Sequence, residues 1–248
     1  TLNLQRQELT RAAQDMIREK IEDPEGMPLI FAGDRGFQPG IVGLVAGRLT
    51  EEFYRPAVVM EEGDTESRAS CRSIPQFDIT HALDQCAMLL VRHGGHAQAA
   101  GFTILNENIP EFRDKLMALA RNALRGQDLL PTLEIDMEVE AADISLDLAL
   151  ELRQLEPTGH MNPTPTLVTR NLRVQDWRTV GQKDQHLKLR LGRPGLGQLD
   201  AIGFNLADNW NAKNGDYVDV AYQLEINEWN GNTTAQLRLL DVKRTGSW

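Results

Sequence analysis

The sequence has 248 residues, of which 41% are hydrophobic and 25% are charged, a composition typical of a water-soluble globular chain long enough for two domains. The net charge of −10 at pH 7 excludes a surface that is basic throughout, and two cysteines are too few for a disulfide framework. No secretory signal or membrane span is recognisable, so we expect a cytoplasmic protein with no membrane partner. Because no methionine begins the chain, we also expect it to be part of a longer protein.

The first half of the chain alternates helical and strand patterns. Residues 4–23 carry apolar side chains at helical spacing and predict a polar-faced connector helix within residues 1–24. Strands and helices then alternate, which predicts an α/β domain over residues 25–126. Asp78 or Thr80 is expected to cap one of the helices. The expected strands are "MPLIFAG", "RPAVVMEE", "ESRASCRSI" and "AGFTIL", and the expected helices are "QPGIVGLVAGRLTEEF", "FDITHALDQCAMLLVR" and "IPEFRDKLMALARNAL".

The second half, residues 127–248, is dominated by strand patterns. Around residues 133–140 four apolar residues, Leu133, Ile135, Met137 and Val139, alternate with acidic ones, which predicts a half-buried strand with an acidic outer face. A helix in "SLDLALELRQL" and a loop in "EPTGHMNPTP" follow. Five further strands then predict a small, partly closed Greek-key barrel of the OB type. These strands are "TLVTRNLRVQDWRTV", "QHLKLRL", "LDAIGF", "DYVDVAYQLEIN" and "TTAQLRLLDVK".

The stretch "HGGHAQAAGF", from His93 to Phe102, is expected to begin as a loop and combines small residues with two histidines. Paired glycines let a backbone approach another group closely. One interpretation is a metal site of His93 and His96, although metal sites need three or four ligands and no cluster at ligand spacing lies nearby. A second is a glycine turn around a packed His96. The third is a phosphate site, in which the backbone N–H groups of Gly94 and Gly95 and the His96 ring donate hydrogen bonds.

The stretch "SRASCRS" supports the phosphate interpretation. In an extended strand Arg68, Ser70 and Arg72 share one face, so guanidinium groups and a hydroxyl point the same way. Arginine on a solvated sheet face is common, so Arg68 alone carries no argument. Ser70 and Arg72, which lie just before Pro75, are the stronger candidates.

The charge of the second half is split along the sequence. Residues 131–164 contain eight acidic residues and one arginine, whereas residues 165–204 contain seven Lys or Arg and three Asp. Trp177 lies within the basic stretch, and strand alternation puts Lys188 and Arg190 on the face opposite neighbouring leucines. One interpretation is a groove for single-stranded nucleic acid, which combines positive charge with aromatic faces. The alternative is that these cations offset the acidic strand.

Three motifs of the first half resemble the DHH-associated domain of RecJ-like single-stranded-DNA-specific exonucleases, which belong to the DHH phosphoesterase superfamily. They are "PGIVGLVAGRLTEEFYRPAVV", "SCRSIPQFDITHAL" and "GGHAQAAGF", in this order. The segments "LEPTGHMNPTPTL", "HLKLRL" and "LDAIGF" are similar to the OB domain of the same enzymes. The resemblance implies an α/β DHH-associated domain followed by a mainly β OB-type barrel. It also implies that the nucleic-acid backbone is bound by Ser70, Arg72, Ser73, Gly94, Gly95 and His96.

The resemblance also implies where the catalysis of such enzymes resides. They cleave through a two-metal site that includes an Asp-His-His motif in a preceding DHH domain, and this sequence has no such motif. We therefore expect no catalytic or metal-binding residue and no cofactor in this chain, with Mn²⁺ or Mg²⁺ in a missing DHH domain in cis.

The expected function is the nucleic-acid-binding part of a 5′ to 3′ single-stranded-DNA exonuclease of DNA repair and recombination. RNA oligonucleotides remain a possible second substrate. One alternative is part of a nano-RNA or small-nucleotide phosphoesterase, although such enzymes generally lack the OB portion. The other alternative is a non-catalytic module that binds single strands.

Overall fold

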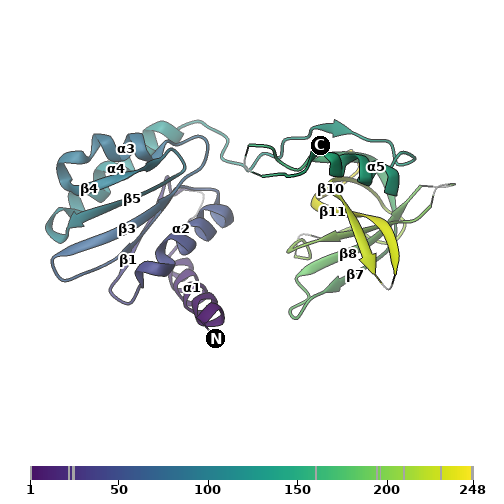
Figure 1. Ribbon diagram of the computed structural model, residues 1–248. Helices are drawn as coiled ribbons and strands as arrows, with labels where there is room; N and C mark the ends of the chain where they lie inside the picture. The colour runs from purple at the N-terminus through teal and green to yellow at the C-terminus, as the bar shows by residue number, and fades with distance from the viewer. Residues whose placement is uncertain are drawn as a thin grey trace. The chain divides into compact units, whose positions relative to one another are not determined.

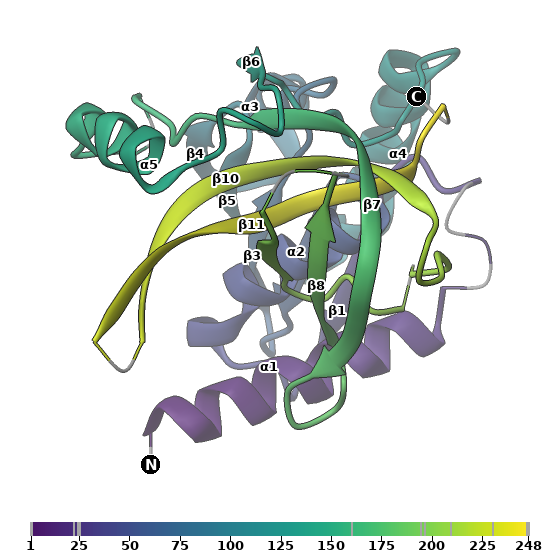
Figure 2. The same cartoon turned by 90° about the vertical axis from the view of Figure 1, so that its right-hand side faces the viewer.

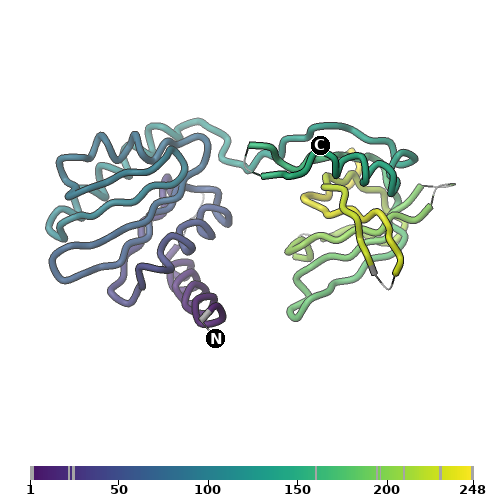
Figure 3. The backbone as a smooth tube through the Cα atoms, in the orientation of Figure 1, coloured from purple at the N-terminus to yellow at the C-terminus, as the bar shows by residue number. Residues whose placement is uncertain are grey.

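The chain forms two compact units, Thr1–Pro131 and Thr132–Trp248 (Figures 1 and 3). The structure is a computed structural model that describes residues 2–246 except 22, 24, 25, 160, 194, 196, 209 and 230. The expected division at residue 126 lies between the last helix of the first unit and Pro131. Within the described residues, no helix is long and apolar enough to cross a membrane.

The first unit is a five-stranded mixed sheet with the strand order β1-β2-β3-β5-β4. Strands β1 and β2 are parallel, and the other neighbours are antiparallel. The strands are β1 (Ile30–Asp34), β2 (Ala57–Glu61), β3 (Glu66–Arg72), β4 (Leu90–His96) and β5 (Ala99–Leu105). The helices are α1 (Leu2–Glu19), α2 (Pro39–Phe53), α3 (Ile79–Gln85) and α4 (Ile109–Leu124), with short 3-10 turns at Ala87–Leu89 and Asn106–Asn108.

Helices cover both faces of this sheet, as an α/β domain requires (Figure 1). Helices α3 and α4 pack on one face, where Phe112 lies 4.7 Å from Phe102, measured between ring centroids. Helices α1 and α2 pack on the other face around Val45, which is fully buried. The α1 helix, expected as a connector, contributes Ala13 and Ile17 to this second core.

The sequence positions of the helices have local causes. Pro39 lies in the first turn of α2, where its missing N–H leaves no hydrogen bond unmade. The Asp78 carboxylate caps α3 by accepting the His81 N–H at 2.9 Å, whereas the Thr80 hydroxyl donates to the His96 carbonyl instead. Of the two caps expected from the sequence, Asp78 is the one that forms.

Two expectations about residues 77–96 are wrong. The helix expected through Arg92 ends at Gln85, and the expected HGGH loop is the second half of strand β4. The cause is long-range pairing, since Arg92 pairs with Thr103 of β5 and the following glycines pair with other small residues of that strand. The turn is confined to residues 97–98.

The second unit is a closed five-stranded barrel (Figure 2). Its strands are β7 (Leu167–Val180), β8 (His186–Gly192), β9 (Leu199–Gly203), β10 (Tyr217–Trp229) and β11 (Asn232–Arg244). The order β7-β8-β9-β11-β10 closes because β10 also pairs with β7. Only the β9–β11 pair among these is parallel. This topology confirms the expected OB-type barrel.

Leucines fill the barrel, and polar residues face outward. Leu187, Leu189 and Leu191 of β8 are fully buried, as the alternation in the sequence predicts. A short helix, α5 (Leu146–Leu152), precedes the barrel and continues as a 3-10 turn at Arg153–Leu155. The Ser145 hydroxyl caps α5 by accepting the Leu148 N–H at 3.1 Å.

The half-buried strand expected at residues 133–140 is wrong in extent and in the burial of its apolar face, whereas its acidic residues are exposed as predicted. Only β6 (Met137–Glu138) is a strand, paired with β7 at the sheet edge. Leu133, Ile135 and Met137 are 41%, 38% and 62% exposed, so three of the four expected core residues face solvent. Val139, at 8% exposure, is the only one of the four that is buried.

Three acidic side chains of this segment contact the rest of the second unit, although all three residues are exposed. Glu138 pairs with Arg170 at 3.2 Å, and Glu140 pairs with Arg193 at 3.1 Å. The Asp136 carboxylate accepts a backbone N–H of the barrel at 2.8 Å. Alternation alone cannot foresee these contacts, which link an exposed segment to the rest of the second unit.

Candidate nucleic-acid interface

Strand register brings four of the expected backbone-binding residues onto one sheet face. Ser70 of β3 pairs with Gly101 of β5, which pairs with Gly94 of β4. One step along, Arg72 and His96 lie on either side of Ala99. Directly paired residues point to the same face of a sheet, so the hydroxyl, the guanidinium, the bare glycine and the imidazole lie together. The phosphate interpretation needs this arrangement.

The same face carries two further arginines. Arg68 pairs with Thr103, which pairs with Arg92, and the Arg92 Nε donates to the Thr103 hydroxyl at 3.1 Å. Glu61 is the neighbour of Arg68 on β2, yet within the described ranges none of the three arginines of this face forms an ion pair. A chain of net charge −10 thus keeps one face whose cations are open to an anion.

Helix α2 covers only one side of this face. Gly43 lies so close to β3 that a Cβ placed on it would be 3.5 Å from Arg72 Nη2 and from Ser70 Oγ. The Arg72 guanidinium, which also donates to the Cys71 carbonyl at 2.9 Å, is thereby half-buried at the edge of the helix. Beyond it the face is open, and a shallow hollow there is lined by Arg68, Arg92, Gly94, Gly101 and Thr103 with their neighbours.

The two glycines of the HGGH stretch have different roles. Gly95 has φ +150°, and a Cβ there would overlap the Ala99 carbonyl oxygen and lie 2.5 Å from the Ala100 Cα. A side chain at Gly95 would therefore strain the fold. A Cβ at Gly94 would meet nothing within 4 Å. No neighbour requires a glycine at this position, so the backbone of Gly94 is open on this side of the sheet.

The two histidines point from opposite faces and do not form a shared site. His93 pairs with Phe102, a core residue, and its Nε2 lies 2.8 Å from an Asp84 carboxylate oxygen. The His96 side chain is exposed and has no partner among the residues that the structure describes. Across the described part of the chain, no group of three His, Cys, Asp or Glu is placed to hold a metal ion. The separation of the two rings onto opposite faces argues against the metal interpretation of this stretch.

Ser73 lies apart from this face. It is buried, and its hydroxyl donates to the Phe77 carbonyl at 2.6 Å. This hydrogen bond stabilises the turn after β3. Cys71 points to the opposite, helix-covered face, where burial raises the pKa of its thiol to about 12. It therefore stays neutral at physiological pH.

The second unit has a separate basic face on the outside of the barrel. Lys188 and Arg190 point outward from β8, and Arg178 of β7 pairs with Lys188. Arg190 lies between Asp176 and Asp200, with its Nε 3.9 Å from the Asp200 carboxylate. Within the part of the unit that is described, Arg178 and Lys188 have no carboxylate partner.

Each of the two interpretations of the basic stretch is therefore supported by a different pair of residues. Arg170 and Arg193 offset acidic residues, as the charge-balance alternative requires. In the described part of the unit, Arg178 and Lys188 stay free of ion pairs and are cations available to a ligand.

Trp177 does not share the face of these cations. It pairs with the buried Leu189, and its ring lies 6.1 Å from that of Trp210, although it remains 40% exposed. An exposed aromatic residue of this unit is Phe204, which is 52% exposed, with the His186 ring edge-on at 5.1 Å and the Arg238 guanidinium 5.9 Å from its centroid. Sequence reasoning missed Phe204, which lies in the turn after β9, where strand alternation no longer applies.

Comparison with known proteins assigns both units. Residues 26–122 match the family described as the DHHA1 domain, and residues 135–241 match the RecJ OB domain. The single-stranded-DNA-specific exonuclease RecJ of Bacillus subtilis is 33% identical over 246 residues, which is 97% of this chain and 31% of the relative.

Solved structures agree with this assignment. RecJ of Thermus thermophilus, in complex with Mg²⁺, superposes with a TM-score of 0.79 at 26% identity, over 99% of this chain and 37% of that protein. Its complex with Mn²⁺ gives the same TM-score at 27% identity. This chain spans about a third of the length of these proteins.

The fold and the matches define a DHH-associated (DHHA1) domain followed by an OB barrel of the RecJ type. The chain corresponds to the DHHA1 and OB portion of RecJ-like exonucleases.

Proposed function

We propose that the chain holds single-stranded DNA for a metal-dependent exonuclease whose catalytic DHH domain belongs to the same longer protein. The observation that carries the proposal is the open face of the first unit. There Ser70, Arg72, Gly94 and His96 lie together, beside two more arginines and, among the described residues, without an ion pair. The likeness to RecJ proteins supports a single DNA strand as the substrate.

The chemistry of this face suits a phosphodiester backbone. The Arg72 guanidinium and the His96 ring donate hydrogen bonds to phosphate oxygens, and Ser70 adds a hydroxyl. Gly94 lets the strand approach the backbone of β4, because no side chain stands between them. Each charge-assisted hydrogen bond contributes about 1.5–3 kcal/mol to binding.

The outer face of the barrel provides a second set of contacts with the strand. OB barrels bind oligonucleotides on the face of their second and third strands, here β8 and β9. Phe204 offers a stacking surface for a base, and Lys188 and Arg178 offer charge for the backbone. Arg190 contributes less to strand binding, because Asp200 partly offsets its charge.

The metal chemistry belongs to the catalytic domain. RecJ of Thermus thermophilus is solved with Mg²⁺ and with Mn²⁺, and the same ions suit the parent of this chain. Two such ions would supply an activated water for hydrolysis of the phosphodiester bond. The residues of this chain bind and orient the strand so that its 5′ end reaches that site. Such an enzyme would act in cytoplasmic DNA repair and recombination.

A chimera tests the proposal. The part of the Bacillus subtilis relative that lies outside the matched region is joined to this chain, and release of nucleotides from labelled DNA is followed in Mn²⁺. We expect degradation of long single strands from the 5′ end, with kcat/KM lowered roughly 10- to 100-fold by Arg72→Ala. Equal turnover of dinucleotides would favour a small-nucleotide phosphoesterase instead. A correctly folded chimera that degrades neither substrate would contradict the proposal.

A further inference from the structure

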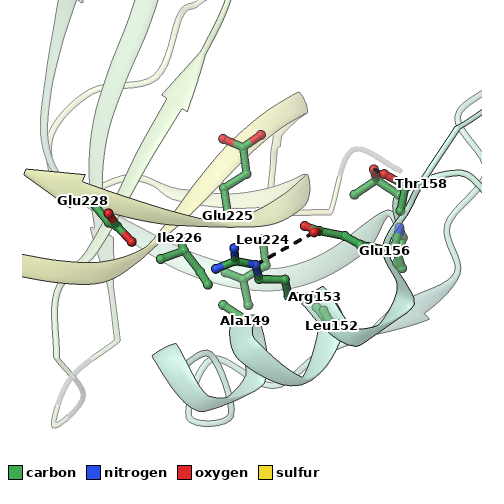
Figure 4. Close-up of a pocket in the computed structure, with 11 residues that line it drawn as sticks. Ala149, Leu152, Arg153, Glu156, Thr158, Leu224, Glu225, Ile226 and Glu228 are labelled. Carbon is green, nitrogen blue, oxygen red and sulfur yellow. Dashed lines mark hydrogen bonds and ion pairs between the residues drawn. The ribbon is translucent and has the colours of Figure 1, made fainter.

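A groove on the second unit lies outside both DNA-binding faces. It has a volume of about 450 Å³ and lies between α5, with the turn after it, and strand β10 (Figure 4). Its apolar floor is formed by Ala149 and Leu152 from the helix and by Leu224 and Ile226 from the strand. Grooves of this size, with an apolar floor and a few polar groups, are typical of binding sites.

One wall of the groove is a free strand edge. Strand β10 pairs with β7 only from Tyr217 to Tyr222, whereas its pairing with β11 continues to Trp229. Past Tyr222, no strand in the described ranges pairs with β10 on the side of β7. The next residue, Gln223, bonds through its side chain to the Thr164 carbonyl. An unpaired edge offers backbone N–H and C=O groups to an incoming strand.

The charge of the groove is acidic. Glu156 lies 3.9 Å from Arg153, so these two charges offset one another. Glu225 points away from the floor in Figure 4 and pairs with Arg238 at 3.3 Å. Glu228, which shares the face of Leu224 and Ile226, has no ion-pair partner among the described residues. An open carboxylate at the rim disfavours a phosphate backbone and favours a cation.

We propose that this groove is the docking site for an extended segment of a partner protein that carries aliphatic side chains and Lys or Arg. The segment adds as a strand to residues 223–229 of β10. Its alternate side chains fill the floor between α5 and β10, and a basic residue meets Glu228. The main-chain bonds provide affinity, and the apolar floor and the carboxylate select the sequence.

Selection from a random-peptide library displayed on phage, with the full 248-residue chain as bait, tests this docking site. The selected peptides are synthesised with a fluorescent label, and their affinity is measured by anisotropy. We expect them to be rich in Lys or Arg and in aliphatic residues, and to bind the Glu228→Lys variant at least about tenfold more weakly. Glu51→Lys, which makes the same charge change on an exposed position of α2, is the matched control and should leave affinity unchanged.

Two further readouts distinguish strand addition at β10 from binding elsewhere on the chain. Peptides with N-methylated backbones keep their side chains but cannot pair with β10, so they should lose binding. Glu228→Lys should not weaken the binding of single-stranded DNA, which uses other faces. Selected peptides that are acidic, that bind Glu228→Lys equally well or that tolerate N-methylation would overturn the proposal, as would a selection that yields no specific peptide.

Discussion

Substitution of the two adjacent glycines of β4 by alanine separates folding from binding. In Gly95→Ala the new Cβ overlaps the Ala99 carbonyl oxygen, and φ +150° is unfavourable for alanine. Backbone strain costs about 1–3 kcal/mol and forced repacking a similar amount, so the first unit should lose about 3 kcal/mol of stability. For Gly94→Ala the space is open, and the change in stability should stay within about 0.5 kcal/mol.

The same pair should behave in the opposite way toward DNA. Gly94→Ala puts a methyl group where we place the phosphate backbone, which should weaken single-strand binding roughly fivefold, or by about 1 kcal/mol. Gly95→Ala should weaken binding only in proportion to the unfolded fraction.

The assay uses the uneven distribution of tryptophan. All four tryptophans lie after residue 131, so their emission follows the second unit alone, whereas circular dichroism follows both units. In urea or on heating, Gly95→Ala should move only the transition seen by circular dichroism, by roughly 10 °C. An unfolding transition of Gly94→Ala as low as that of Gly95→Ala, or unchanged DNA binding by Gly94→Ala, would refute the division of roles.

Three further predictions concern single side chains. Because burial raises the pKa of the Cys71 thiol from 9.0 to about 12, the first unit should lose stability as the pH rises above 9, and Cys71→Ala should remove this loss in unfolding experiments. Burial raises the pKa of Glu52, but hydrogen bonds from Arg18 and a glutamine outweigh it and lower the pKa overall. This stabilisation should be lost as the pH falls below 4.5, and Glu52→Gln should show a smaller loss in acid, with a difference of no more than about 1 kcal/mol. Phe204→Ala should weaken oligonucleotide binding by about 1–3 kcal/mol, whereas Trp177→Ala should chiefly lower the temperature of the barrel's thermal transition. The opposite pattern would show that Trp177, and not Phe204, stacks on the bases.

The sequence was sufficient where one local pattern decides the structure. The alternation around Lys188 and Arg190 placed both outside the barrel, because three leucines between and beside them had to be buried. The spacing of Ser70 and Arg72 put both on one face for the same reason.

Other features depend on pairing between distant residues. The face of Trp177 could not be foreseen, because a bulge between Val174 and Asp176 changes the alternation of β7. The HGGH stretch resembles a loop because glycine is rare in strands, yet here the glycines of β4 face small residues of β5. At residues 133–140 the alternation predicted a buried apolar face, but only Val139 is buried there. The acidic residues are exposed, as predicted, and two of them pair with Arg170 and Arg193.

The central claim is that this chain binds a single DNA strand through the open face of its first unit. The most direct test is a titration of a fluorescent single-stranded oligonucleotide with the full chain and its Arg72→Ala/His96→Ala variant, at several salt concentrations. If Arg68, Arg72 and Arg92 of the first unit and Arg178 and Lys188 of the barrel each neutralise a phosphate, the slope of log K against log salt should be about −3.5. The double variant should bind at least about tenfold more weakly with a shallower slope. No binding at low salt, or the same affinity and slope for both proteins, would contradict the claim.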